Sequence, residues 1–120
     1  MIAENKRSPV TQLRNDNIGA VLGEDDHPIF IACLRKDKDY KLNRNQLEKM
    51  AAYFGDDITI CFALDDILPY FSKRYGVGGT PTFLMIRQGE LLDTMLGKES
   101  MQSLIEFCKT HVPGKTISLK

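Results

Sequence analysis

Two strand-sized runs of mostly apolar residues constrain the fold of this chain more than any other feature. They are Pro28–Leu34 and Ile58–Leu64. Each run is far shorter than the roughly 20 apolar residues that a membrane-spanning helix requires. A strand that is apolar at nearly every position is buried on both faces, which is typical of a parallel sheet covered by helices. The two runs therefore predict the centre of an α/β domain.

The segments around these runs follow helical and hairpin patterns. We expect Asn15 or Asp16, Asp65 or Asp66, and Ser100 to cap three of the helices, because side-chain oxygens of these types bond the free N–H groups of a first turn. The expected order β-α-β-α-β-α-β-β-α predicts a mixed central sheet flanked by helices. Its elements are a strand at Val10–Leu13, a helix ending near Leu22, the strand Pro28–Leu34, a helix with Leu47, Met50, Ala51 and Phe54 on one stripe, the strand Ile58–Leu64, a short helix with Pro69 in its first turn, a hairpin of Thr82–Arg87 and Glu90–Leu96, and a helix after Ser100.

Length and charge narrow the class of protein. A chain of 120 residues fits one domain. We expect that domain at residues 10–112, after an N-terminal extension (residues 1–9) and before a mobile C-terminal tail (residues 113–120). Sixteen basic residues balance sixteen acidic ones, which argues against a dedicated nucleic-acid binder. The first residues lack the apolar stretch of a signal peptide, so a cytoplasmic protein with no membrane contact is expected.

One segment, Tyr75–Glu90, has the sequence YGVGGTPTFLMIRQGE. It resembles the thioredoxin family, in which a Tyr-Gly-Val-x-Gly-x-Pro-Thr segment leads into an apolar strand and a Gly-Glu turn. Gly97 stands where the family has a glycine that closes the following strand. The resemblance extends over about residues 10–112, and it implies a single thioredoxin-like domain.

The resemblance also implies a binding loop. The peptide bond between Thr80 and Pro81 is expected to be cis, since X–Pro bonds are the only ones that adopt cis cheaply. In the family, the residue before this proline pairs its backbone N–H and C=O with an extended substrate segment. That residue is Thr80 here.

The chain departs from the family where the redox chemistry would be. Thioredoxins carry a Cys-x-x-Cys motif at the start of the helix after the second strand, but this place falls in Lys36–Lys41, which contains no cysteine. Ala32 and Phe62 stand where redox-active members bury an acid and a lysine. The resemblance therefore implies neither an attacking nor a resolving thiol for disulfide exchange.

Three cysteines are present elsewhere. Cys33 and Cys61 lie in the two apolar runs, and Cys108 lies on the apolar stripe of the last helix. Buried free cysteine is a common small core residue, and we expect this role for all three. The alternative is a pair that oxidises, or one thiol that retains oxidoreductase activity. With two histidines and three separated cysteines, no metal site is expected.

A charged run, Arg35–Arg44, precedes the second helix. Five basic residues against Asp37 and Asp39 leave a local charge of +3 at the start of a helix, where anions are favoured. This run is either a solvated loop or part of a site for an acidic partner, and Tyr40 could add an aromatic contact. The predicted binding surface comprises Gly79, Thr80, Pro81, Gly97, Lys38, Tyr40 and Lys41.

These observations favour a redox-inactive, thioredoxin-like binding domain that holds an extended segment of a partner protein, in an adaptor, assembly or chaperone-like role. No catalytic residue, cofactor or metal is predicted. One alternative is a thiol-disulfide oxidoreductase with an atypical cysteine, contributing to cell redox homeostasis. Another is a structural subunit that associates through its sheet edge or last helix. The oligomeric state is left open.

Overall fold

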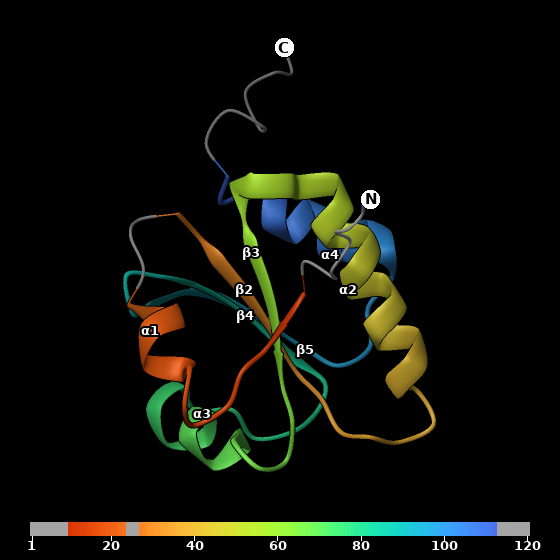
Figure 1. The fold of residues 1–120 in the computed structure, drawn as a ribbon. Helices are drawn as coiled ribbons and strands as arrows, with labels where there is room; N and C mark the ends of the chain where they lie inside the picture. Colours follow the sequence, from red (N-terminus) through yellow and green to blue (C-terminus); the bar gives the residue numbers. More distant parts are fainter. Residues whose placement is uncertain (1–9, 24–26, 113–120) are drawn as a thin grey trace, which may run out of the picture.

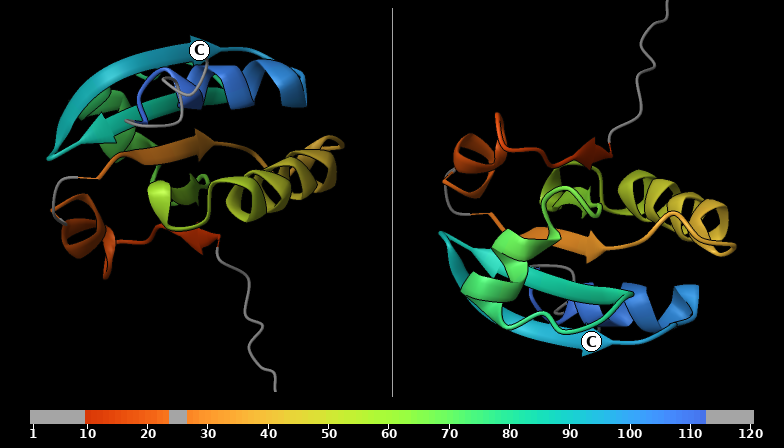
Figure 2. Two further views of the ribbon diagram at one scale, coloured as in Figure 1. Left: turned by 90° about the horizontal axis from the view of Figure 1, so that it is seen from above. Right: turned by 90° about the horizontal axis from the view of Figure 1, so that it is seen from below.

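A computed structural model describes residues 10–23 and 27–112 of the chain. A five-stranded mixed sheet forms its centre, and helices pack on both faces (Figures 1 and 2). The predicted element order is confirmed, and the fold is that of a single thioredoxin-like domain. The predicted extension (residues 1–9) and tail (residues 113–120) lie outside the described residues. The elements are β1 (Thr11–Gln12), α1 (Ile18–Leu22), β2 (Ile29–Cys33), α2 (Tyr40–Phe54), the 3-10 turn η1 (Gly55–Asp57), β3 (Thr59–Ala63), α3 (Leu68–Tyr75), β4 (Thr82–Arg87), β5 (Glu90–Leu96) and α4 (Met101–Lys109).

The strand order in the sheet is β1-β3-β2-β4-β5. Strands β1, β3 and β2 are parallel, whereas β4 is antiparallel to β2 and β5 is antiparallel to β4. All five residues of β2 are buried. The prediction of strands buried on both faces is thus confirmed for β2, which lies at the centre of the sheet.

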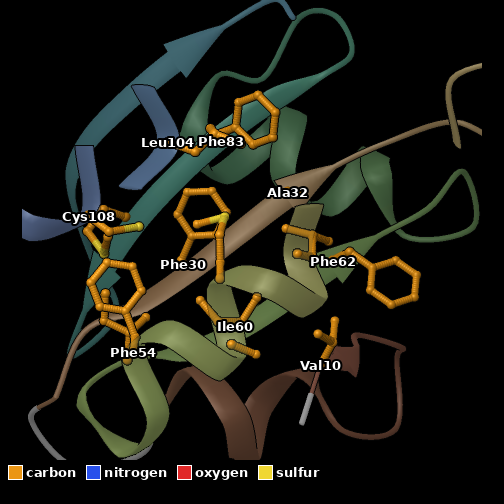
Figure 3. Close-up of a cluster of buried hydrophobic side chains, with 14 of the residues drawn as sticks. Val10, Phe30, Ala32, Phe54, Ile60, Phe62, Phe83, Leu104 and Cys108 are labelled. Carbon is orange, nitrogen blue, oxygen red and sulfur yellow. The ribbon is translucent and has the colours of Figure 1, made fainter. Parts of the chain in front are cut away.

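Two hydrophobic layers cover the sheet. On one face, α2 and α4 pack over a cluster that includes Phe30, Phe83 and Leu104 (Figure 3). On the other face, α1 and α3 pack over a cluster that includes Ile31 and Phe71. Phe30 has no exposed surface, and its ring centroid lies 5.8 Å from that of Phe83 and 6.1 Å from that of Phe107. The alternation of side chains along β2 separates the two layers, because successive residues point to opposite faces.

Two of the predicted helix caps are wrong. Asn17, rather than Asn15 or Asp16, occupies the N-cap position of α1, and its side chain makes no capping bond. Its Oδ1 instead accepts a hydrogen bond from the Arg14 N–H (2.7 Å), and its Nδ2 donates to the Gln12 carbonyl (3.0 Å). The side chain that a capping pattern would use therefore secures the exit from β1.

The second wrong cap is at α3, where Ile67 occupies the N-cap position. Asp65 and Asp66 stand earlier, exposed in the turn after β3. The predicted place of Pro69 in the first turn is correct, as is the predicted cap of α4: the Ser100 Oγ accepts a hydrogen bond from the Ser103 N–H at 3.1 Å.

Strand β5 forms one edge of the sheet. Leu91, Leu92 and Leu96 on this strand are exposed. Asp93 lies among them, and its Oδ1 accepts a hydrogen bond from the Thr94 N–H at 2.9 Å while its Oδ2 lies 3.2 Å from His111 Nε2. A carboxylate on an edge strand discourages pairing with another chain. Among the helices of the described residues, none is long and apolar enough to cross a membrane.

We predict that Phe30→Ala lowers the free energy of unfolding by about 3–5 kcal/mol, because it leaves a cavity between two aromatic rings. Urea unfolding followed by circular dichroism measures this value. Leu42→Ala is the control: Leu42 is 54% exposed, and its truncation should change stability by less than about 0.5 kcal/mol. Equal effects of the two substitutions would contradict the described core.

Candidate binding groove

Three chain segments meet at the end of the sheet where the parallel strands β2 and β3 finish, at the bottom of Figure 1. Cys33, the last residue of β2, is in register with Ala63 of β3 and with Thr82 of β4. Because β2 and β3 are parallel, both finish at this end of the sheet, and the antiparallel β4 begins there. The segments that follow β2 and β3 therefore lie beside the segment that precedes β4.

An open groove of about 500 Å³ lies between these segments. The β2–α2 loop contributes Arg35 and the β3–α3 loop contributes Asp65. Helix α3 and the loop before β4 complete the lining with Leu68, Pro69, Ser72, Val77, Gly78, Gly79 and Thr80. Apolar and charged groups thus alternate with stretches of bare backbone, which is a surface suited to an extended peptide.

Two hydrogen bonds, one from β4 and one from the residue after β5, fix the loop before β4. The Thr82 Oγ1 donates to the Gly79 carbonyl at 2.6 Å, and the Gly97 N–H donates to the Pro81 carbonyl at 2.8 Å. The peptide bond between Thr80 and Pro81 is cis. The backbone of Thr80, between these anchors, makes no hydrogen bond to any other residue in the described part of the chain. Its N–H and C=O remain available to a ligand.

The glycines on the groove are not required by the backbone. A Cβ added at Gly78 or Gly79 would meet no atom within 4 Å, and neither residue has a left-handed φ. Space for a side chain is therefore present at both positions. The absence of side chains leaves the backbone open to close approach by a ligand.

Gly97 has a different role. Its φ is +96°, in the region that favours glycine, and its N–H donates to Pro81. It does not line the groove. Gly97 is therefore a positioning residue, which holds the loop from β5.

The predicted contribution of Lys38 and Lys41 lies to the side of the groove. Both side chains are exposed and neither lines the groove. Asp39 connects this turn to the end of β5, because its Oδ2 lies 3.6 Å from Lys38 Nζ and 3.4 Å from Lys98 Nζ. A direct contact of Lys38 and Lys41 with a partner stays a prediction.

Tyr40 is half-buried and serves as an anchor for α2. Its ring packs edge-to-face on Phe62 with centroids 6.4 Å apart, and its hydroxyl accepts a hydrogen bond from Arg44 Nη1 at 3.3 Å. The Arg44 guanidinium lies 4.4 Å from the centroid of the Phe62 ring. This is a cation–π arrangement. It lies at the position where the resemblance to thioredoxins implies a lysine in redox-active members. Ala32, in register with Phe62, is fully buried.

Sequence reasoning missed Arg35 and Asp65 as groove residues. A signal for both was present: each comes directly after a predicted buried strand, and neighbouring parallel strands finish at the same end of a sheet. Combining this rule with the loop before β4 would have placed them next to Thr80.

All three cysteines are buried, and none of them is in a disulfide. Burial raises the pKa of Cys33 and of Cys108 from 9.0 to about 12, so both remain thiols at neutral pH. Cys33 is in register with Ala63, whereas Cys61 is in register with Ile31. The expectation of core cysteines is confirmed. Within residues 10–23 and 27–112, no group of three or more His, Cys, Asp and Glu side chains could hold a metal ion.

Comparison with known proteins agrees with the fold at a distance. No protein-family model matches the chain. A curated thioredoxin from Rhodospirillum rubrum is 30% identical over 66 residues. The match covers 55% of this chain and 64% of the thioredoxin, slightly less than two thirds of the relative's length. It is consistent with a thioredoxin-like family.

We predict opposite effects of alanine at two glycines of the loop region. Gly97→Ala should lower the free energy of unfolding by about 1–3 kcal/mol, because alanine is strained at a positive φ. Gly79→Ala should leave it unchanged or raise it by up to about 1 kcal/mol, since the site has space and the unfolded chain loses freedom. Urea unfolding of both variants measures this difference, and equal destabilisation would contradict the roles given to the two glycines.

We predict slow thiol labelling and an alkaline loss of stability. The native protein should react with a thiol reagent at neutral pH far more slowly than the unfolded protein. Above pH 9, ionisation of Cys33 and Cys108 in the unfolded chain should cost about 1.4 kcal/mol of stability per thiol and pH unit, until the folded pKa of about 12 is reached.

Below pH 9 this contribution is fully present. Urea unfolding at pH 8 and pH 10 compares the wild type with Cys33→Ala/Cys108→Ala, whose stability should fall less between the two pH values. An equal fall in the two proteins would contradict the burial of these thiols.

Proposed function

We propose that this chain is a thioredoxin-like binding domain that holds an extended segment of a partner protein along Gly79 and Thr80, without thiol exchange. The observation that carries the proposal is the combination of an open groove with backbone groups of Thr80 that are held in place and have no hydrogen-bond partner among the described residues. The Thr80 N–H and C=O lie between two anchored carbonyls, those of Gly79 and Pro81. An extended segment could pair with them as a short added strand.

Bare backbone at Gly78 and Gly79 supports the same proposal. Glycine at a position that would accept a side chain costs conformational entropy on folding, so a reason outside the fold is expected. Close approach of a second backbone supplies that reason. An adaptor, assembly or chaperone-like role in the cytoplasm follows as part of the proposal.

The alternative is a thiol-disulfide oxidoreductase that contributes to redox homeostasis. The thioredoxin relative favours it. The burial of all three cysteines and the raised pKa of Cys33 and Cys108 weigh against it, because the thiolate is the nucleophile in disulfide exchange. A structural subunit that pairs through β5 is disfavoured by the carboxylate of Asp93 on that edge.

The binding proposal is tested with a phage library of random nine-residue peptides without cysteine. We expect the immobilised wild type to enrich peptides and Gly79→Leu to enrich none of them, because the leucine fills the groove. Gly19→Leu is the matched control. It adds the same side chain at another glycine with open space, on helix α1, and Gly19 does not line the groove.

Both variants should unfold at urea concentrations close to that of the wild type. Enrichment that persists in Gly79→Leu, or its absence in the wild type, would contradict the proposed site.

The alternative is tested by the reduction of insulin disulfides in the presence of dithiothreitol. We expect no acceleration above the reductant alone, because no thiol of the native protein is accessible. A thioredoxin with two active-site cysteines is the positive control. Acceleration that disappears on a serine substitution of Cys33, Cys61 or Cys108 would establish the oxidoreductase instead.

A further inference from the structure

Charges of opposite sign lie on two adjacent loops at one end of the groove. Arg35 and Lys36 follow β2, whereas Asp65 and Asp66 follow β3. Since β2 and β3 are adjacent and parallel, the two loops lie side by side. Arg35 and Asp65 both line the groove, and Lys36 lies with Asp65 and Asp66 at a smaller hollow next to it.

Lys36 Nζ lies over the Tyr40 ring, 5.8 Å from its centroid, whereas Arg35, Asp65 and Asp66 have no partner among the described residues. All four side chains belong to exposed residues, and none forms an ion pair with another described residue. Charges a few residues away behave differently, since Asp39 pairs with both Lys38 and Lys98. Arg35 and Asp65 thus line the groove from two adjacent loops, and neither charge is paired with the other.

The groove beside these two charged loops is partly apolar. Leu68, Pro69 and Val77 line it, and Val77 is 8% exposed. A ligand lying over these side chains would exclude water from part of the groove. Charge–charge interactions strengthen where water is excluded, so the charges of Arg35 and Asp65 would then both act on a bound segment.

We propose that the groove selects segments that carry one acidic and one basic side chain a few residues apart, with the acid facing Arg35 and the base facing Asp65. This inference rests on the proposed function and names the class of partner. Backbone pairing with Thr80 sets the direction of the segment, so the two charges must follow each other in a fixed order. A segment with the reverse order meets a like charge at Arg35 and another at Asp65, and this repulsion disfavours its binding.

The experiment uses the same peptide library and a variant in which the charges at positions 35 and 65 are reversed. Wild-type protein should enrich peptides with an acidic and a basic residue in one order. Arg35→Glu/Asp65→Lys should enrich peptides with the opposite order. The best wild-type peptide should bind the reversed variant about five- to tenfold more weakly, because attraction is replaced by repulsion at two positions. Fluorescence anisotropy of the labelled peptide measures this change.

Matched controls reverse charges elsewhere. Lys49→Glu/Asp56→Lys changes one exposed cation on α2 and one exposed anion in η1, and neither residue lines the groove. This variant should keep the wild-type order and affinity. If the reversed variant fails to fold by circular dichroism, Arg35→Gln/Asp65→Asn replaces it and should lose the preferred order with about two- to fivefold weaker binding.

The outcomes separate the two proposals. Two outcomes would overturn this inference and leave the binding site in place. In the first, the wild type enriches peptides with no preferred order of acidic and basic residues. In the second, the order that it prefers is unchanged in Arg35→Glu/Asp65→Lys. No enrichment by the wild type would overturn the proposed function, and this inference with it.

Discussion

The pairing of β2 with β3 is the constraint on which the rest of the structure depends. Both strands are short and largely apolar, so each must be covered on both faces, and parallel pairing with helical crossovers achieves this. Once the strands are adjacent and parallel, both finish at the same end of the sheet. The antiparallel β4 begins at that end. The groove is a consequence of this arrangement rather than a separate feature.

The groove contains fixed backbone, bare glycine and unpaired charge. Two hydrogen bonds to the Gly79 and Pro81 carbonyls hold the loop, so the Thr80 backbone is positioned before any ligand arrives. A positioned binding surface loses less conformational entropy when a segment binds. The turn that would carry the dithiol in a thioredoxin holds Lys38–Lys41 and is tied to the end of β5 through Asp39 and Lys98. Its charges therefore support the structure beside the groove.

Local sequence predicted the elements better than their details. The bounds of β4 and β5 agree with the prediction, because an apolar run and a Gln88–Gly89 turn define a hairpin within one short segment. The caps of α1 and α3 were predicted wrongly, since capping patterns do not reveal which partner a side chain finds in space. Asn17 bonds Arg14 and Gln12 instead of its helix. Arg35 and Asp65 were missed for the same reason: 30 residues separate them in the chain, and only the sheet brings them together.

The sequence by itself determined the α/β order, the burial of the cysteines and the absence of a Cys-x-x-Cys motif. These follow from apolar patterns and residue identity, which are local properties of the chain. The tertiary structure alone decided which glycines are strained and which are open, as at Gly97 and Gly79. It also decided which charges are paired and which line the groove. These properties depend on distances between residues far apart in sequence, and such distances exist only when parallel strands and their loops are assembled.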